Sequence, residues 1–130
     1  MERIKQRGEE DCGVACVAML IQRYAACPAA SSYDAARAVL FGAREVGLTK
    51  TKDIKRALAA FGIQAGRSRQ SFRAESKHDL GLEFDAIVGT QPRKDESWHW
   101  MVWDSKRQVL IDPLNDGRNR RQVTHYLRIG

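Results

Sequence analysis

One of the three cysteines in this chain stands where a nucleophile could act. Cys12 follows a polar stretch ending at Asp11 and precedes an apolar helical pattern, so we expect it at or beside a helix N-terminus. Unpaired backbone N–H groups and the helix dipole stabilise a thiolate there, and the thiolate is the reactive form. Gly13 would leave room for a substrate backbone, and Asp11 could cap the helix. We expect Cys16 and Cys27 to be small buried apolar residues instead.

A base and a group to orient it are predicted from a hairpin. A turn at residues 105–106 joins two strand-like segments, and a loop of residues 105–106 or 104–107 would place His99 directly opposite Asp112. Opposed side chains share one face of a sheet with Cβ atoms about 4.5–5.5 Å apart, so the carboxylate could hold the imidazole in one tautomer. A solvated His–Asp pair is the simpler alternative. The nearby tryptophans favour a partly desolvated working pair instead; they are Trp98, Trp100 and Trp103.

Gln6 offers a carboxamide donor upstream of the cysteine. Together with the backbone N–H of Cys12, it could bind a developing oxyanion. The spacing alone does not establish this role.

The elements that would position these residues are helices first and strands afterwards. Helices are predicted over 14–26, which Cys27-Pro28 ends, over 33–41 and over 52–61. Their expected caps are Ser31-Ser32 for the second helix and Thr49 or Thr51 for the third, with Gly42 and Gly62 closing them.

Short apolar, β-branched or aromatic runs then predict an antiparallel sheet. The expected strands cover 63–69, 85–90, 97–104, 107–112 and 122–129, with turns at 91–96 and 115–117 and no assignment for 70–83. The fold class is therefore α+β, with N-terminal helices packed on a C-terminal sheet.

Length and composition bound the function. The 130 residues fit a single domain over 1–130, and the net charge of +6 would suit an acidic partner. No apolar run spans a bilayer and the N-terminus does not read as a signal peptide, so we expect a cytoplasmic protein. The odd number of cysteines argues against a disulfide framework. We expect no cofactor and no metal.

Three motifs together resemble the bacteriocin-processing cysteine peptidases, a papain-like family. These motifs are Gln6 with Asp11-Cys12-Gly13, His99-Trp-Met-Val-Trp, and Leu110-Ile-Asp112-Pro113, which span most of the chain in the family's order. The resemblance implies a papain-like fold, a nucleophile at Cys12, a base at His99, an orienting residue at Asp112 and an oxyanion donor at Gln6. It also implies cleavage of leader peptides after a double glycine, and a possible transporter or secretion partner.

Other functions stay open from the sequence. The same residues could carry acyl transfer or glutamine deamidation, as in a toxin or effector acting on another protein. Cys12 and Cys16 with His99 or His78 could hold zinc. The arginines and tryptophans could bind nucleic acid, although the tryptophans are better explained as core and cleft wall, and we expect a peptide or protein substrate.

Overall fold

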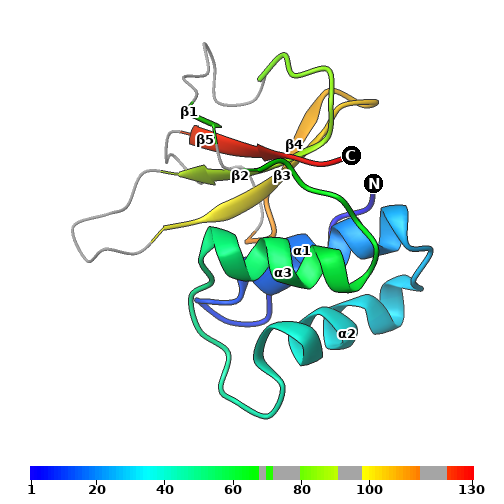
Figure 1. The fold of residues 1–130 in the computed structure, drawn as a ribbon, viewed down its shortest axis with the longest axis vertical. Helices are drawn as coiled ribbons and strands as arrows, with labels where there is room; N and C mark the ends of the chain where they lie inside the picture. The colour runs from blue at the N-terminus through cyan, green and yellow to red at the C-terminus, as the bar shows by residue number, and fades with distance from the viewer. Residues whose placement is uncertain (68–69, 72–79, 91–97, 115–122) are drawn as a thin grey trace.

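Three helices pack against one face of a five-stranded antiparallel sheet in the computed structural model (Figure 1). The structure describes residues 1–67, 70–71, 80–90, 98–114 and 123–130. The predicted α+β class is confirmed, with the helices preceding the sheet in the chain. The predicted turns at 91–96 and 115–117 lie outside the described residues.

Helix α1, Cys12–Tyr24, is the centre of the molecule. It contacts strand β3 on one side and the helices α2, Ala29–Phe41, and α3, Thr51–Ala60, on the others. All residues from 12 to 21 are buried, which is why this helix is apolar nearly all round. The helix predicted over 14–26 is present, but it begins two residues earlier, at Cys12, and ends two residues earlier, at Tyr24.

The second and third helices begin differently from the prediction. Helix α2 starts at Ala29 with Pro28 as its N-cap, and the Ser31 hydroxyl donates back to the Pro28 carbonyl. Ser31-Ser32 is therefore inside the helix and does not cap it. Helix α3 has Lys50 as its N-cap, and the Lys50 N–H donates to the Asp53 carboxylate at 3.1 Å. Neither Thr49 nor Thr51 is the cap.

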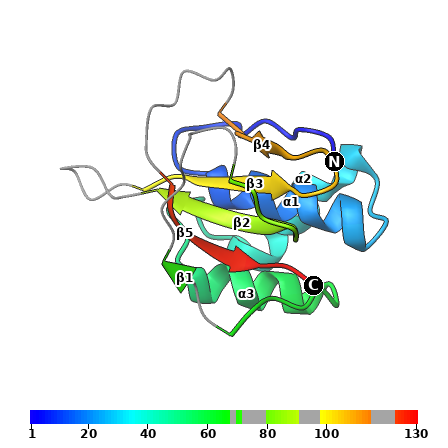
Figure 2. The ribbon, with the colours of Figure 1, turned by 90° about the horizontal axis from the view of Figure 1, so that it is seen from above.

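The strands follow the order β1-β5-β2-β3-β4 across the sheet, as Figure 2 shows from above. Their bounds are β1 Gln70–Ser71, β2 Ala86–Thr90, β3 Trp100–Asp104, β4 Val109–Ile111 and β5 Val123–Arg128. The strand expected over 63–69 is reduced to an isolated bridge between Ala65 and Ile129, and residues 68–69 lie outside the described part of the chain.

Alternation along β3 separates two apolar cores. Trp100 and Val102 face the helices and pack with α1, whereas Met101 and Trp103 belong to a second cluster on the other side of the sheet. The predicted burial of the tryptophans is confirmed for Trp100 and Trp103, and Trp98 is partly buried.

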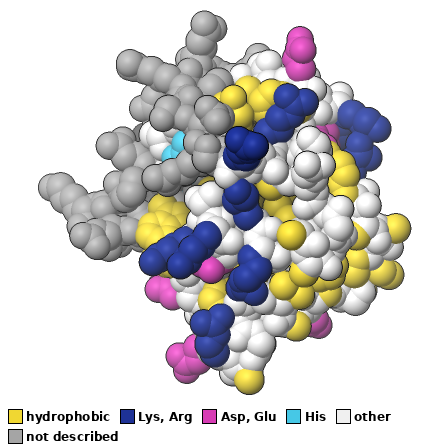
Figure 3. Space-filling model, in the orientation of Figure 1, with side chains coloured by type: hydrophobic (Ala, Val, Ile, Leu, Met, Phe, Trp, Pro, Cys, Tyr) yellow, Lys and Arg dark blue, Asp and Glu magenta, His cyan; other side chains and the backbone are white. Residues whose placement is uncertain are grey.

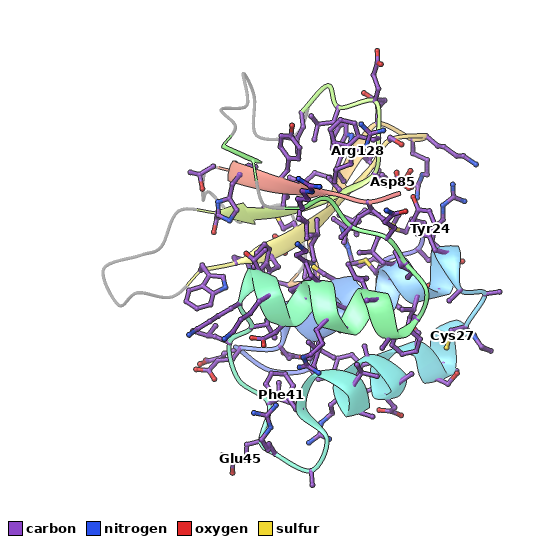
Figure 4. The ribbon with its side chains drawn as sticks, viewed as in Figure 1. Tyr24, Cys27, Phe41, Glu45, Asp85 and Arg128 are labelled. Atoms are coloured by element: carbon purple, nitrogen blue, oxygen red, sulfur yellow. The ribbon has the colours of Figure 1, made fainter. Side chains whose placement is uncertain are left out.

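The far end of α1 is tied to the hairpin between β3 and β4. The Tyr24 hydroxyl donates to the Asp85 carboxylate, and Figure 4 shows the two residues close together. The same carboxylate accepts the backbone N–H and the hydroxyl of Ser105 at 2.7 and 2.8 Å. Because Ser105 is held in this way, the turn begins there and covers residues 105–108.

Basic side chains lie over much of the face shown in Figure 3. Two of the arginines have a structural partner at the end of α2. Arg44 donates to the Leu40 and Phe41 carbonyls, and Arg56 donates to those of Val39 and Leu40. Cations at a helix C-terminus satisfy its free carbonyls and complement its dipole.

Candidate active site

Cys12 is the first residue of α1 and is only 2 % exposed. Its sulfur accepts a hydrogen bond from the backbone N–H of Trp100, the first residue of β3, at 3.5 Å. The predicted position at a helix N-terminus is therefore confirmed. The contact also places the cysteine directly beside the segment that carries His99.

His99 and Asp112 form a buried pair. The His99 Nε2 and the Asp112 Oδ1 lie 2.7 Å apart, and the two residues are 5 % and 8 % exposed. The same carboxylate oxygen accepts the backbone N–H of Leu114 at 2.9 Å, which fixes its orientation. Since Nε2 is held by Asp112, the other ring nitrogen is available to the Cys12 thiol.

The hairpin register that predicted this pair is wrong by two residues. Asp104 pairs with Val109, and Val102 pairs with Ile111, because the loop covers residues 105–108. Asp112 therefore continues the register opposite Met101, diagonal to His99 and not directly opposite it. A shift of two residues keeps both side chains on the same face, and diagonal neighbours remain within reach of long side chains.

The environment of His99 favours its protonated form. Burial lowers the pKa of the imidazole, but hydrogen bonds with Asp112 and with the Cys12 thiol outweigh this effect and raise the pKa to about 9. The ring is therefore an imidazolium near neutral pH. A cation beside a cysteine stabilises the thiolate form.

The backbone of His99 is held from both sides. Its N–H donates to the Thr90 hydroxyl at 3.1 Å, and its carbonyl accepts the Thr90 N–H at 3.1 Å. The indole N–H groups of the flanking Trp98 and Trp100 both donate to the Thr49 carbonyl, at 2.9 and 3.0 Å. The backbone of His99 and the two residues beside it are therefore held by hydrogen bonds to Thr90 and Thr49.

Thr49 also packs against the residue after the nucleophile. A Cβ atom on Gly13 would lie 2.0 Å from the Thr49 Oγ1, so only glycine fits at this position. Gly13 was predicted to leave space for substrate, whereas the structure fills that space with Thr49. Thr49 thus connects the start of α1 to the tryptophans around His99, a role that its sequence position did not indicate.

Gln6 is bound through its backbone beside Asp112, the carboxylate of the His99–Asp112 pair. Its backbone N–H donates to the carbonyl of Pro113, the residue after Asp112, at 2.9 Å. Its side-chain Nε2 donates to the Gly8 carbonyl at 2.7 Å, which leaves the second N–H of the amide for another acceptor.

Asp11 does not cap α1 through its side chain. Its carboxylate is occupied by the backbone N–H groups of Arg7 and Gly8 and by the Tyr33 hydroxyl. Asp11 therefore occupies the predicted N-cap position, but its side chain makes no cap bond, because the loop before the helix and helix α2 use both oxygens.

The other two cysteines differ in burial, and the alternative zinc site has no group of ligands. Cys16 is fully buried, and burial together with the nearby Cys12 and Asp112 raises the pKa of its thiol. Cys27 is only partly buried, contrary to the prediction. Within the described part of the chain, no three His, Cys, Asp or Glu side chains are grouped to hold a metal ion, and His78 lies outside it.

Comparison with known proteins adds one finding to this geometry. The model of a family described as the Peptidase C39 family matches residues 1–125, a range that includes every candidate site residue. No curated protein matches the chain. In the described residues, none of the helices is long and apolar enough to cross a membrane.

Proposed function

The chain belongs to the peptidase C39 family of cysteine peptidases, as its motifs predicted, and we propose that it hydrolyses a peptide bond with Cys12, His99, Asp112 and Gln6. Its α+β arrangement agrees with the papain-like fold of that family. The observation that carries the proposed triad is the buried 2.7 Å contact between His99 and Asp112, on a segment whose next residue touches the Cys12 sulfur.

Catalysis begins with the Cys12 thiolate and the His99 imidazolium. The sulfur attacks the carbonyl carbon of the scissile bond, a C–S bond forms and the carbonyl oxygen becomes an oxyanion. Collapse of this intermediate breaks the C–N bond, and His99 gives its proton to the departing amine. His99 then takes a proton from water as the water attacks the thioester. The C–S bond then breaks, the carboxylic acid product leaves, and the Cys12 thiolate and the His99 imidazolium are restored.

The oxyanion needs donors that are fixed before the reaction. The backbone N–H of Cys12 has no partner within the helix, because it lies in the first turn of α1. The second N–H of the Gln6 carboxamide provides the other donor. Loss of one such donor typically lowers turnover about 10²–10³-fold.

The substrate we propose is a leader peptide that is cleaved after Gly-Gly. Cys12 is 2 % exposed, so the acyl part of a substrate must approach the sulfur with little bulk, and glycine carries no side chain. Family membership supports the same substrate class. We further propose that cleavage takes place in the cytoplasm, with a transporter or secretion component as the partner that removes the product.

A peptide panel tests the activity and the substrate together. Purified protein is incubated with peptides that carry Gly-Gly, Gly-Ala or Leu-Leu before the scissile bond, and the products are identified by mass spectrometry. We expect two fragments from the Gly-Gly peptide, little cleavage of the others and none with Cys12→Ala. A mass gain of about one dalton in an intact glutamine peptide would indicate the alternative, a deamidase. Equal cleavage of all three peptides would refute the Gly-Gly preference while leaving the peptidase in place.

A further inference from the structure

The carboxylate immediately before the nucleophile has no part in the mechanism above. Asp11 is 3 % exposed and precedes Cys12, where negative charge develops on the sulfur and on the substrate oxygen. An anion in this position opposes that charge. A buried carboxylate is also costly unless it is well hydrogen-bonded. Its presence therefore requires a structural explanation.

Three donors surround this carboxylate. Oδ2 accepts the Arg7 backbone N–H at 2.6 Å and the Tyr33 hydroxyl at 2.5 Å, and Oδ1 accepts the Gly8 backbone N–H at 2.8 Å. Tyr33 belongs to α2 and is itself buried, so it fixes the Asp11 side chain to the helical layer. The Arg7 guanidinium lies over the Tyr33 ring, 3.9 Å from its centroid.

Gly8 connects this cluster to the candidate oxyanion donor. Its N–H is bound by Asp11, and its carbonyl accepts the Gln6 Nε2 at 2.7 Å. The Gln6 backbone N–H is bound in turn by the Pro113 carbonyl. The loop that carries Gln6 is thus held at one end beside the nucleophile and at the other end beside Asp112.

We propose that Asp11 is a positioning residue, which acts through Gly8 to hold the Gln6 carboxamide in the orientation that binds the oxyanion. This inference rests on the proposed role of Gln6. One amide N–H stays on Gly8 and the other is presented to the substrate. Without the carboxylate, residues 7 and 8 lose their shared acceptor and the amide loses its fixed partner.

The test is a double-mutant cycle between Asp11→Asn and Gln6→Ala, measured as kcat and KM on the Gly-Gly peptide. Asparagine keeps the size of the side chain but replaces one acceptor oxygen by an N–H donor, which would face another N–H or a hydroxyl. We expect Asp11→Asn to lower kcat about 10–100-fold with little change in KM, below the 10²–10³-fold limit for complete loss of one donor. The double variant should be no slower than Gln6→Ala alone. If the fold-losses of kcat in the two single variants multiply in the double variant, the proposal is overturned.

Alkylation of Cys12 by iodoacetamide separates this role from activation of the thiol. Alkylation forms no carbonyl oxyanion, so Asp11→Asn should be labelled within about threefold of the wild-type rate. A tenfold loss of labelling would place Asp11 in thiol activation and refute the positioning role. If Gln6→Ala retains full activity, the proposed function of Gln6 fails instead. Asp34→Asn is the matched control, because within the described residues this carboxylate binds only the Arg7 side chain and is 70 % exposed.

Tyr33→Phe tests the same inference if Asp11→Asn does not fold. It removes one of the three donors and keeps the carboxylate. We expect a two- to tenfold fall in kcat in the wild-type background and none in the Gln6→Ala background. An equal fall in both backgrounds would refute the proposed path through Gln6.

Discussion

Replacing Asp112 with asparagine should lower the pH at which activity is lost on the alkaline side. The active form proposed above contains an imidazolium at His99, and activity ends when this ring loses its proton. Burial lowers the pKa of His99, while the hydrogen bonds with Asp112 and Cys12 raise it to about 9. Relative to the ordinary value of 6.5, this corresponds to roughly 3 kcal/mol in favour of the charged ring, at 1.36 kcal/mol per pH unit.

The largest single cause that raises the pKa of His99 is its hydrogen bond with Asp112. Asparagine can still accept the Nε2–H hydrogen bond through its oxygen, so the ring keeps its orientation while the negative charge is lost. The burial that opposes protonation remains. We therefore expect the alkaline limit to fall from about pH 9 by at least one pH unit, and kcat/KM at pH 8.5 to fall about threefold or more. The loss at pH 6 should be smaller.

The measurement is the pH profile of kcat/KM between about pH 5 and 10 at constant ionic strength, since such a profile reports the pKa values of the free enzyme. Asp34→Asn, an exposed carboxylate on α2, should leave the alkaline limit near that of the wild type. A profile for Asp112→Asn that still ends near pH 9 would show that this carboxylate does not set the protonation of His99.

Two further predictions concern stability. Gly13→Ala would force its new methyl group against Thr49, so we expect urea denaturation to show a free energy of unfolding lower by about 1–3 kcal/mol. Thr49→Ala in the same chain should restore part of this loss. An unchanged free energy of unfolding would mean that the two segments separate freely. The pKa of His99 is higher in the folded chain than the ordinary value, so its contribution to stability is complete below about pH 6.5 and is lost as the pH rises through about 9. The stability difference between wild type and His99→Gln should shrink by up to roughly 3 kcal/mol between pH 6 and 10, and a difference that grows over this range would contradict the reasoning.

The sequence predicted the His99–Asp112 pair despite an incorrect register, and the reason is geometric. Side chains alternate between the faces of a strand, so an error of two residues preserves the face while an error of one would have reversed it. The correct loop depends on Asp85, which holds Ser105 from a segment about twenty residues away in the chain. Such a tertiary contact leaves no local signal in the turn itself.

The predicted N-caps of α2 and α3 were wrong for a related reason. Ser31-Ser32 and the two threonines are good N-cap residue types. However, Pro28 takes the N-cap position of α2, and its carbonyl already accepts the backbone N–H groups of Ser31 and Ser32. Pro28 therefore begins α2 earlier. Thr49 is buried, its side chain packs against Gly13, and its carbonyl accepts the N–H groups of two indoles. Propensity describes a local preference, which packing against distant residues overrides.

The proposed catalytic groups depend for their positions on residues that would take no part in the chemistry. Thr90 fixes the backbone of His99, Thr49 connects that segment to α1, and Asp11 holds the loop of Gln6. Each of these three residues is at least 95 % buried. Thr90 and Asp11 accept backbone N–H groups through their side chains, whereas Thr49 accepts the two indole N–H groups through its main-chain carbonyl. Removing the Thr90 hydroxyl or the Asp11 carboxylate leaves buried donors without acceptors, at about 1–3 kcal/mol each. The site's geometry is therefore maintained by the same hydrogen bonds that stabilise the fold, and substitutions at these positions should lower activity and stability together.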